Sequence, residues 1–141
     1  MISPVAEYWP RFGLSPEDLM ERARECCGRA YAPYSGFPVG AAVLTEWGKV
    51  VGGCNVENAS YGMSLCAERV AMAGAALAGS RHPLAIAVAS GRPAFCPPCG
   101  ACRQFLSEFN PEIDVVLSVD GRLEIYRLDF LLPHRFKLEM T

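Results

Sequence analysis

The spacing of hydrophobic and polar residues predicts helices that alternate with strands along most of the chain. The segment 15–18, Ser-Pro-Glu-Asp, is typical of a helix start, because serine caps free backbone N–H groups and acids suit the positive end of a helix. Apolar residues then recur at helical spacing and predict a helix to about residue 30. Further helices are expected over residues 65–78, 100–109 and 128–132.

Short apolar runs between these helices predict strands. Residues 39–44 and 50–55 flank a Glu-Trp-Gly turn in a hairpin pattern, and the continuously apolar run 84–89 is typical of a central strand. Two more strands are expected over residues 115–118 and 123–127, around an Asp-Gly turn. The fold class predicted is α/β: a three-layer α/β/α sandwich with one mixed five-stranded sheet.

We expect one domain over residues 1–141, because the chain shows no repeat, low-complexity tract or linker. Residues 1–14 are expected to form an irregular lead that packs on the body. The chain is 51% hydrophobic and 20% charged, which is enough to bury a core and argues against disorder. The net charge is −2 without a basic cluster, so nucleic-acid and membrane-surface binding are not expected. The start of the chain lacks the pattern of a secretory signal, and no apolar run reaches about 18 residues, so a cytoplasmic protein is expected.

The seven cysteines point to a metal site rather than to a disulfide framework, given a reducing compartment. Cys26, Cys27 and Cys54 are expected to be small buried hydrophobic residues. The remaining four lie in two short motifs, Cys-Ala-Glu-Arg at 66–69 and Cys-Pro-Pro-Cys-Gly-Ala-Cys at 96–102. These motifs carry the chemistry of the chain.

Three thiols of these motifs are predicted to hold a zinc ion: Cys66, Cys99 and Cys102. Cys99 and Cys102 share one face at the start of a helix, and a helix start favours the thiolate that binds metal. Three protein ligands leave a fourth position for water, which is the layout of a catalytic zinc site. Glu68 can move protons beside it. Alone, Glu68 could be an ordinary acid favoured by the helix dipole, but both cysteine motifs together favour the catalytic interpretation.

Two neighbouring residues leave alternatives open. Three thiolates on Zn²⁺ leave a negative centre, and we hypothesise that Arg69 hydrogen-bonds the ligand sulfurs to offset that charge; otherwise Arg69 makes an ordinary surface ion pair. Cys96 could supply a fourth thiolate and turn the zinc into a structural ion. The interpretation preferred here is that Cys96 replaces a small hydrophobic residue, because a closed site would leave Glu68 without a role.

With these motifs in view, the chain resembles cytidine deaminase, in its small-subunit, three-cysteine, homotetrameric type. The resemblance runs from about residue 19 to residue 136 and rests on separated motifs in the right order. They are Tyr-Ser-x-Phe-Pro-Val-Gly-Ala-Ala at 34–42, Gly-Cys-Asn-Val-Glu-Asn at 53–58, Cys-Ala-Glu-Arg at 66–69 and Pro-Cys-Gly-Ala-Cys-Arg-Gln at 98–104.

That resemblance implies zinc-dependent hydrolytic deamination of cytidine and 2′-deoxycytidine, with one zinc ion per chain and no nucleic-acid partner. Asn55 and Glu57 match the pair that binds the ribose 3′-hydroxyl, and the Ala67 backbone matches the contact to the pyrimidine O2. Three aromatic residues match positions around the base: Phe37 in the nucleoside pocket, and Tyr61 and Phe136 across a subunit interface. A homotetramer with active sites shared between subunits is therefore expected.

Other functions fit these residues less well. A deaminase of an aminopyrimidine nucleoside antibiotic such as blasticidin S has similar zinc motifs, but Asn55 and Glu57 favour ribose recognition. A polynucleotide deaminase needs cationic contacts to phosphates, and a clamp on a 3′-hydroxyl does not suit a polymer. A non-catalytic zinc module or a dithiol redox protein explains neither Cys66 nor Glu68.

Overall fold

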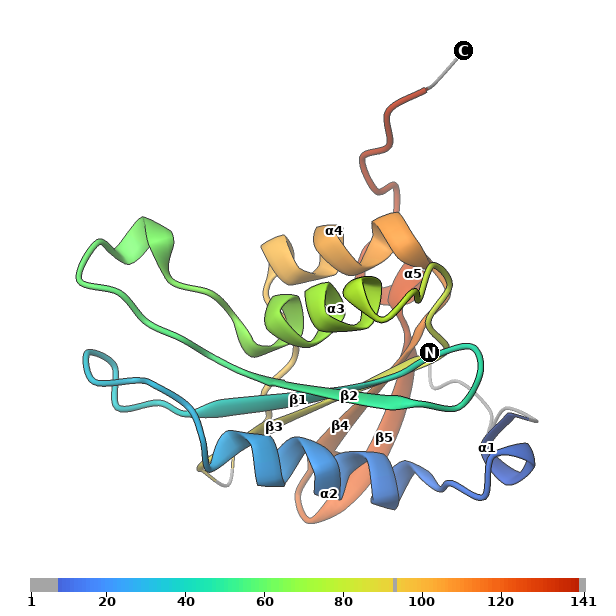
Figure 1. Cartoon of the computed structure of the whole chain (residues 1–141), viewed down its shortest axis with the longest axis horizontal. Coiled ribbons are helices and arrows are strands. Elements are labelled where there is room, and N and C mark those ends of the chain that lie inside the picture. The colour runs from blue at the N-terminus through green and yellow to red at the C-terminus, as the bar shows by residue number, and fades with distance from the viewer. Residues whose placement is uncertain (1–7, 93, 140–141) are drawn as a thin grey trace.

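A computed structural model describes residues 8–92 and 94–139, and its elements follow the predicted order (Figure 1). The helices are α1 (Tyr8–Arg11), α2 (Pro16–Cys27), α3 (Ala67–Leu77), α4 (Gly100–Phe109) and α5 (Leu128–Leu131), with a 3₁₀ turn η1 (Tyr61–Met63). The strands are β1 (Val39–Leu44), β2 (Val50–Cys54), β3 (Ala85–Ser90), β4 (Asp114–Val119) and β5 (Arg122–Arg127).

Within the described residues the strands form one five-stranded sheet in the order β2-β1-β3-β4-β5. The pair β3–β4 is parallel and the other neighbouring pairs are antiparallel. Asp120 and Gly121 both adopt positive φ in the tight turn between β4 and β5, as such a hairpin requires. The predicted mixed five-stranded sheet is confirmed.

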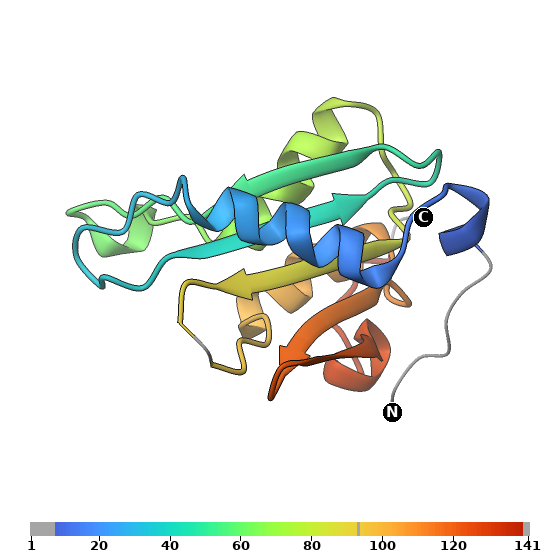
Figure 2. The ribbon, with the colours of Figure 1, turned by 90° about the horizontal axis from the view of Figure 1, so that it is seen from below.

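Helices cover both faces of this sheet. Figures 1 and 2 show α2 on one face and α3, α4 and α5 on the other. Each face has its own buried cluster among the described residues: α2, with Leu19 and Ala23, packs on Ala42 and Ala87, whereas α3 and α4 pack on the opposite side chains of the same strands. The predicted α/β/α sandwich is therefore confirmed.

The segment before α2 shows how local sequence sets the bounds of a helix. Ser15 Oγ accepts the Asp18 N–H at 3.2 Å, and the Asp18 carboxylate accepts the Ser15 N–H at 3.0 Å, so the predicted start of α2 is confirmed. The helix ends at Cys27, earlier than the predicted residue 30, because turns follow at residues 28–30. Residues 1–7 of the predicted irregular lead lie outside the described part; residues 8–11 are instead the short helix α1, whose Trp9 packs in the core at 1% exposure.

Gly53 lets α3 lie directly on β2. A Cβ atom at this position would be 2.4 Å from the backbone nitrogen of Ala71, closer than side chains approach backbone. Since Ala71 is only one turn into α3, this contact fixes where the helix begins relative to the end of β2. The start of α3 and the residues that follow β2 are thereby brought to the same end of the sheet.

Candidate metal centre and its pocket

Two helix starts bring three sulfur atoms together. Cys66 and Cys99 are the residues just before α3 and α4, and Cys102 lies in the first turn of α4. Figure 1 shows α3 and α4 side by side with their first turns at the same end. The three sulfurs lie within 4.8 Å of one another, with 3.5 Å between those of Cys99 and Cys102.

This sulfur group fits a zinc ion. Tetrahedral ligation at about 2.3 Å per Zn–S bond separates the sulfurs by about 3.8 Å, so small side-chain movements suffice to close the group on the ion. Within residues 8–92 and 94–139, no other group of three or more cysteine, histidine or acidic side chains is placed to hold a metal ion. The predicted trio is therefore positioned as zinc ligation requires.

The thiols of this group differ in their tendency to ionise. Burial pushes the pKa of Cys99 upward, but hydrogen bonds from Cys102, Cys66 and the Ala101 N–H outweigh it and hold that pKa below its ordinary value. Burial, followed by the negative charge of Glu68, raises the pKa of Cys102. A cation that binds all three sulfurs must displace the protons that remain, so metal binding and proton release are coupled here.

Glu68 lies in the first turn of α3 and is only 5% exposed. Burial raises the pKa of its carboxyl, against the opposing effects of its own backbone N–H, the Cys102 thiol and the charge of Arg69. A carboxyl in this environment holds a proton more readily than an ordinary glutamate. A buried carboxyl with a raised pKa beside the sulfur group is a candidate for proton transfer.

Arg69 reaches back to the sulfur group from the same helix. Its Nη2 donates to Cys66 Sγ at 3.7 Å and to the Ser64 carbonyl at 3.3 Å. The hydrogen bond to Cys66 raises the pKa of Arg69. Among the described atoms, its buried Nε has no hydrogen-bond partner. The guanidinium thus lies where the charge-offsetting hypothesis requires, and its effect on the bound metal stays a prediction.

A pocket of about 240 Å³ opens beside this group. Its lining includes four of the predicted site residues outside the metal ligands: Asn55, Glu57, Ala67 and Glu68. The wall also holds two ligand cysteines, Cys66 and Cys99, together with Val39, Ser64, Leu65, Cys96 and Pro97. Residues far apart in the sequence thus meet in one hollow the size of a small ligand.

Asn55 and Glu57 also hold the loop that forms one side of this pocket. Asn55 accepts the Val39 N–H and donates to the Phe37 carbonyl, both at 2.9 Å. The Glu57 carboxylate accepts the N–H groups of Tyr34 and Ser35 at 3.0 Å, and also the Ser35 hydroxyl, which lowers the pKa of Glu57. Sequence reasoning missed Ser35 as a partner, although it stands in one of the motifs quoted above.

The three predicted aromatic residues lie outside the described lining of this pocket. Phe37 is half-buried, with the Arg92 guanidinium 5.3 Å from its ring centre. Tyr61 is 75% exposed in η1 and meets Tyr34 edge to face at 5.8 Å. Phe136 is 70% exposed near the end of the chain. Tyr61 instead lines a neighbouring hollow that shares Glu57 and Ser64 with this pocket.

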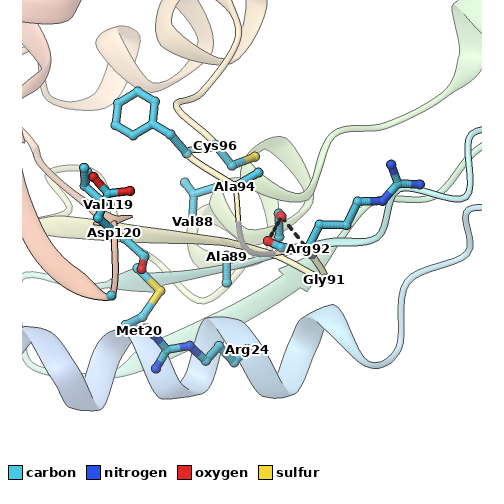
Figure 3. Close-up of a pocket in the computed structure, with 14 residues that line it drawn as sticks. Met20, Arg24, Val88, Ala89, Gly91, Arg92, Ala94, Cys96, Val119 and Asp120 are labelled. Atoms are coloured by element: carbon cyan, nitrogen blue, oxygen red, sulfur yellow. Dashed lines mark hydrogen bonds between the residues drawn. The ribbon is translucent and has the colours of Figure 1, made fainter.

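The remaining cysteines differ in burial and position. Cys27 is buried as predicted, whereas Cys26 and Cys54 are only half-buried. Cys96 lines the pocket but lies outside the sulfur group, and burial together with the charge of Glu68 raises its pKa. It also lines a second hollow of about 560 Å³ between α2, the end of β3 and the β4–β5 turn, shown in Figure 3. Cys96 thus stands in the wall between two hollows.

In the part of the chain that the structure describes, no helix has both the length and the apolar character needed to cross a bilayer.

Comparisons with known proteins agree with this geometry. The family model described as "Cytidine and deoxycytidylate deaminase zinc-binding region" matches residues 15–118. A cytidine deaminase of Sporosarcina psychrophila is 42% identical over 125 residues, covering 87% of this chain and 92% of the relative. That of Halalkalibacterium halodurans is 43% identical over 123 residues, covering 86% and 93%. The crystal structure of cytidine deaminase from Burkholderia pseudomallei has a TM-score of 0.82 and 46% identity, covering 87% of this chain and 100% of that chain.

Proposed function

Because this chain belongs to the cytidine and deoxycytidylate deaminase family, we propose that it hydrolyses the exocyclic amino group of cytidine and 2′-deoxycytidine. The products are uridine or 2′-deoxyuridine and ammonia. The observation that carries the proposal is the buried Glu68 carboxyl in one small pocket with the ligand sulfurs of Cys66 and Cys99. That combination serves hydrolysis of an amidine better than it serves a structural zinc.

Cys66, Cys99 and Cys102 hold one zinc ion in this proposal. When bound, zinc supplies the Lewis acidity that makes water a usable nucleophile near neutral pH. Cys96 stays outside the ligand set, which keeps a position open on the pocket side. Arg69, through its contact with Cys66, offsets part of the negative charge of three thiolates.

Glu68 moves the protons of the reaction. Its carboxylate takes a proton from the water that attacks C4 of the pyrimidine and passes it to N3. It then takes the remaining proton from the new C4 hydroxyl and delivers it to the amino group. The C4–N bond breaks, C4 becomes a carbonyl carbon, and the amino group leaves as ammonia. The raised pKa of Glu68 supports this role, since a carboxyl that takes up a proton more readily than an ordinary glutamate suits a proton acceptor beside the water.

Asn55 and Glu57 bind the ribose 3′-hydroxyl, and the Ala67 backbone contacts O2 of the base. Their support is that all three line the same pocket as Glu68. Both polar side chains already bind the 34–39 loop, so the loop and the sugar would share them. Phe37, on that loop, packs near the base.

Tyr61 and Phe136 act in the site of a neighbouring subunit of a homotetramer. Their support is high exposure in one chain, where neither ring is among the residues that line the pocket. We further propose a single domain over residues 1–141 and a cytoplasmic role in pyrimidine salvage.

The test is ammonia release by the zinc-loaded protein from cytidine, 2′-deoxycytidine, blasticidin S and a cytosine-containing oligonucleotide. Turnover of the two nucleosides is expected. Glu68→Gln is expected to lower kcat about 10²–10⁴-fold while zinc is retained. Glu17→Gln is the matched control, because Glu17 also lies in the first turn of a helix but is exposed on α2. Full activity of Glu68→Gln, or turnover of blasticidin S alone, contradicts the proposal.

A further inference from the structure

Arg103, in the first turn of α4, binds two main-chain carbonyls that belong to different parts of the chain. Its Nε donates to the Pro98 carbonyl at 2.8 Å, and its Nη1 donates to the Leu131 carbonyl at 2.7 Å. Arg103 forms no ion pair with an acidic side chain among residues 8–92 and 94–139. Its half-buried guanidinium is used as a bridge rather than as a partner for a carboxylate.

The place of this arginine is electrostatically unusual. A cation in the first turn of a helix is opposed by the helix dipole, whereas a cation at a C-terminal end is favoured. Leu131 is the last residue of α5, so the Arg103 guanidinium satisfies a free carbonyl at such an end. The two carbonyl bonds therefore account for a charge that α4 alone would disfavour.

The Pro98 contact acts on the metal ligands. Pro98 is buried and directly precedes Cys99. The Arg103 side chain follows Cys102 in the chain and binds back to the Pro98 carbonyl, so the two bonded residues flank Cys99 and Cys102. This bond closes the turn around both cysteines. Their sulfurs, 3.5 Å apart, are thus held near each other by the protein itself.

The Leu131 contact acts on the C-terminal segment, residues 131–136. The neighbouring side chain on α4, Gln104, donates from Nε2 to the Phe136 carbonyl at 2.9 Å. Two successive side chains therefore fix both ends of this segment to α4, while the Phe136 ring stays exposed.

We propose that Arg103 is a positioning residue that joins the cysteine turn to the C-terminal segment and so sets the affinity of the metal site. Its catalytic consequence rests on the proposed function, whereas its effect on metal retention does not. Groups that orient metal ligands commonly change metal affinity or activity about 10–100-fold when removed.

The experiment compares Arg103→Gln with Arg81→Gln in the full-length zinc protein. Arg81 is a matched control because it also binds two carbonyls, those of Ala76 and Ser80 at 2.9 and 2.8 Å, but beyond the end of α3. Zinc transfer to a chromogenic chelator, kcat, KM and Tm are measured for each. Arg103→Gln is expected to release zinc about 10–100-fold faster, and Arg81→Gln at the wild-type rate.

A second variant separates the effect of the two carbonyl hydrogen bonds from the effect of the positive charge of Arg103. Arg103→Lys keeps the charge but lacks the planar fork that reaches both carbonyls, so it is expected to release zinc nearly as fast as Arg103→Gln. Gln104→Ala is the milder probe should the arginine variants fold poorly. It is expected to raise KM and leave zinc release unchanged, because it frees Phe136 alone.

The inference is overturned if Arg103→Gln releases zinc at the wild-type rate, or if Arg103→Lys behaves as wild type. It is also overturned if Arg81→Gln accelerates zinc release as much as Arg103→Gln does, because the effect is then one of general stability. Failure of the wild-type protein to deaminate cytidine overturns the proposed function instead, and the zinc comparison still decides the role of Arg103.

Discussion

A glutamate side chain lies near each end of α3, and the surroundings shift the pKa values of these two carboxyls in opposite directions. At the start, burial raises the pKa of Glu68. Beyond the end, Glu46 from the β1–β2 turn accepts the Ser80 hydroxyl at 2.6 Å and the N–H groups of Arg81 and His82 at 2.9 Å. Burial pushes the pKa of Glu46 upward as well, but these hydrogen bonds outweigh it and hold the pKa at about 2.

The two pKa values differ because the two carboxylates have different numbers of hydrogen-bond donors around them. Glu46 is surrounded by donors that fix it as a charged anchor for the chain leaving α3. Glu68 is enclosed, and donors do not outweigh the effect of burial on its pKa. A fully satisfied carboxylate stabilises structure, whereas an enclosed one with a raised pKa is available for proton transfer. The start of α3 therefore suits the proton transfer proposed for Glu68, whereas the bonds at its far end suit a stabilising role.

The largest effect that tests this contrast is expected from removing a sulfur at the start. Cys102→Ala should abolish stoichiometric zinc binding and lower activity by at least about 10²-fold, since outer partners of a metal alone are worth 10–100-fold. Metal analysis and ammonia release measure the two effects. Cys54→Ala is the control, because this half-buried thiol binds only the Arg29 carbonyl and lies outside the sulfur group. Stoichiometric zinc in Cys102→Ala would refute the ligand assignment.

A smaller effect, on stability rather than activity, is expected at the far end. Glu46→Gln should lower the free energy of unfolding by about 1–2 kcal/mol, because a charged acceptor of several hydrogen bonds is lost from a partly exposed site. The kcat at 25 °C should not change. Denaturant unfolding at neutral pH measures this, with Glu21→Gln as the control for an exposed ion pair. A large loss of activity without loss of stability would erase the contrast between the two ends.

The smallest effect is the pH dependence that Glu46 gives to folding. Its folded pKa of about 2 lies below the ordinary value of 4.5, so its stabilising effect is fully present above about pH 4.5. That effect is lost as the pH falls from about 4.5 to about 2, because the unfolded chain takes up the proton first. The difference in unfolding free energy between wild type and Glu46→Gln should shrink across that range. A difference that grows on acidification would contradict the assigned pKa.

The sequence predicted those features that depend on local patterns. The strand at residues 39–44 and the helix at 100–109 are confirmed with their bounds, and Ser15 marks its helix start as expected. Helix α1 was missed because four residues show no period, and its position depends on burial of Trp9. The grouping of the three sulfurs was predictable because the residue type and the spacing of Cys66, Cys99 and Cys102 both carry information.

Contacts between distant segments were not predictable in the same way. Glu46 and Ser80 meet across the hairpin and α3, and nothing in their spacing indicates it. The long-range bond of the Arg103 side chain goes to the main-chain carbonyl of Leu131, and a residue of any type can supply a carbonyl. The same holds for Asn55, whose link to the Phe37 carbonyl appears only once the sheet has formed.

The sulfur group draws its members from both sides of β3, and this has a consequence for synthesis of the protein. When β1, β2 and α3 have emerged from the ribosome, the nascent chain carries only one of the three sulfurs, that of Cys66. The other two emerge together with the first turn of α4, just ahead of β4 and β5. Metal loading is therefore confined to the last stage of translation or later, when the sheet lacks only its final hairpin.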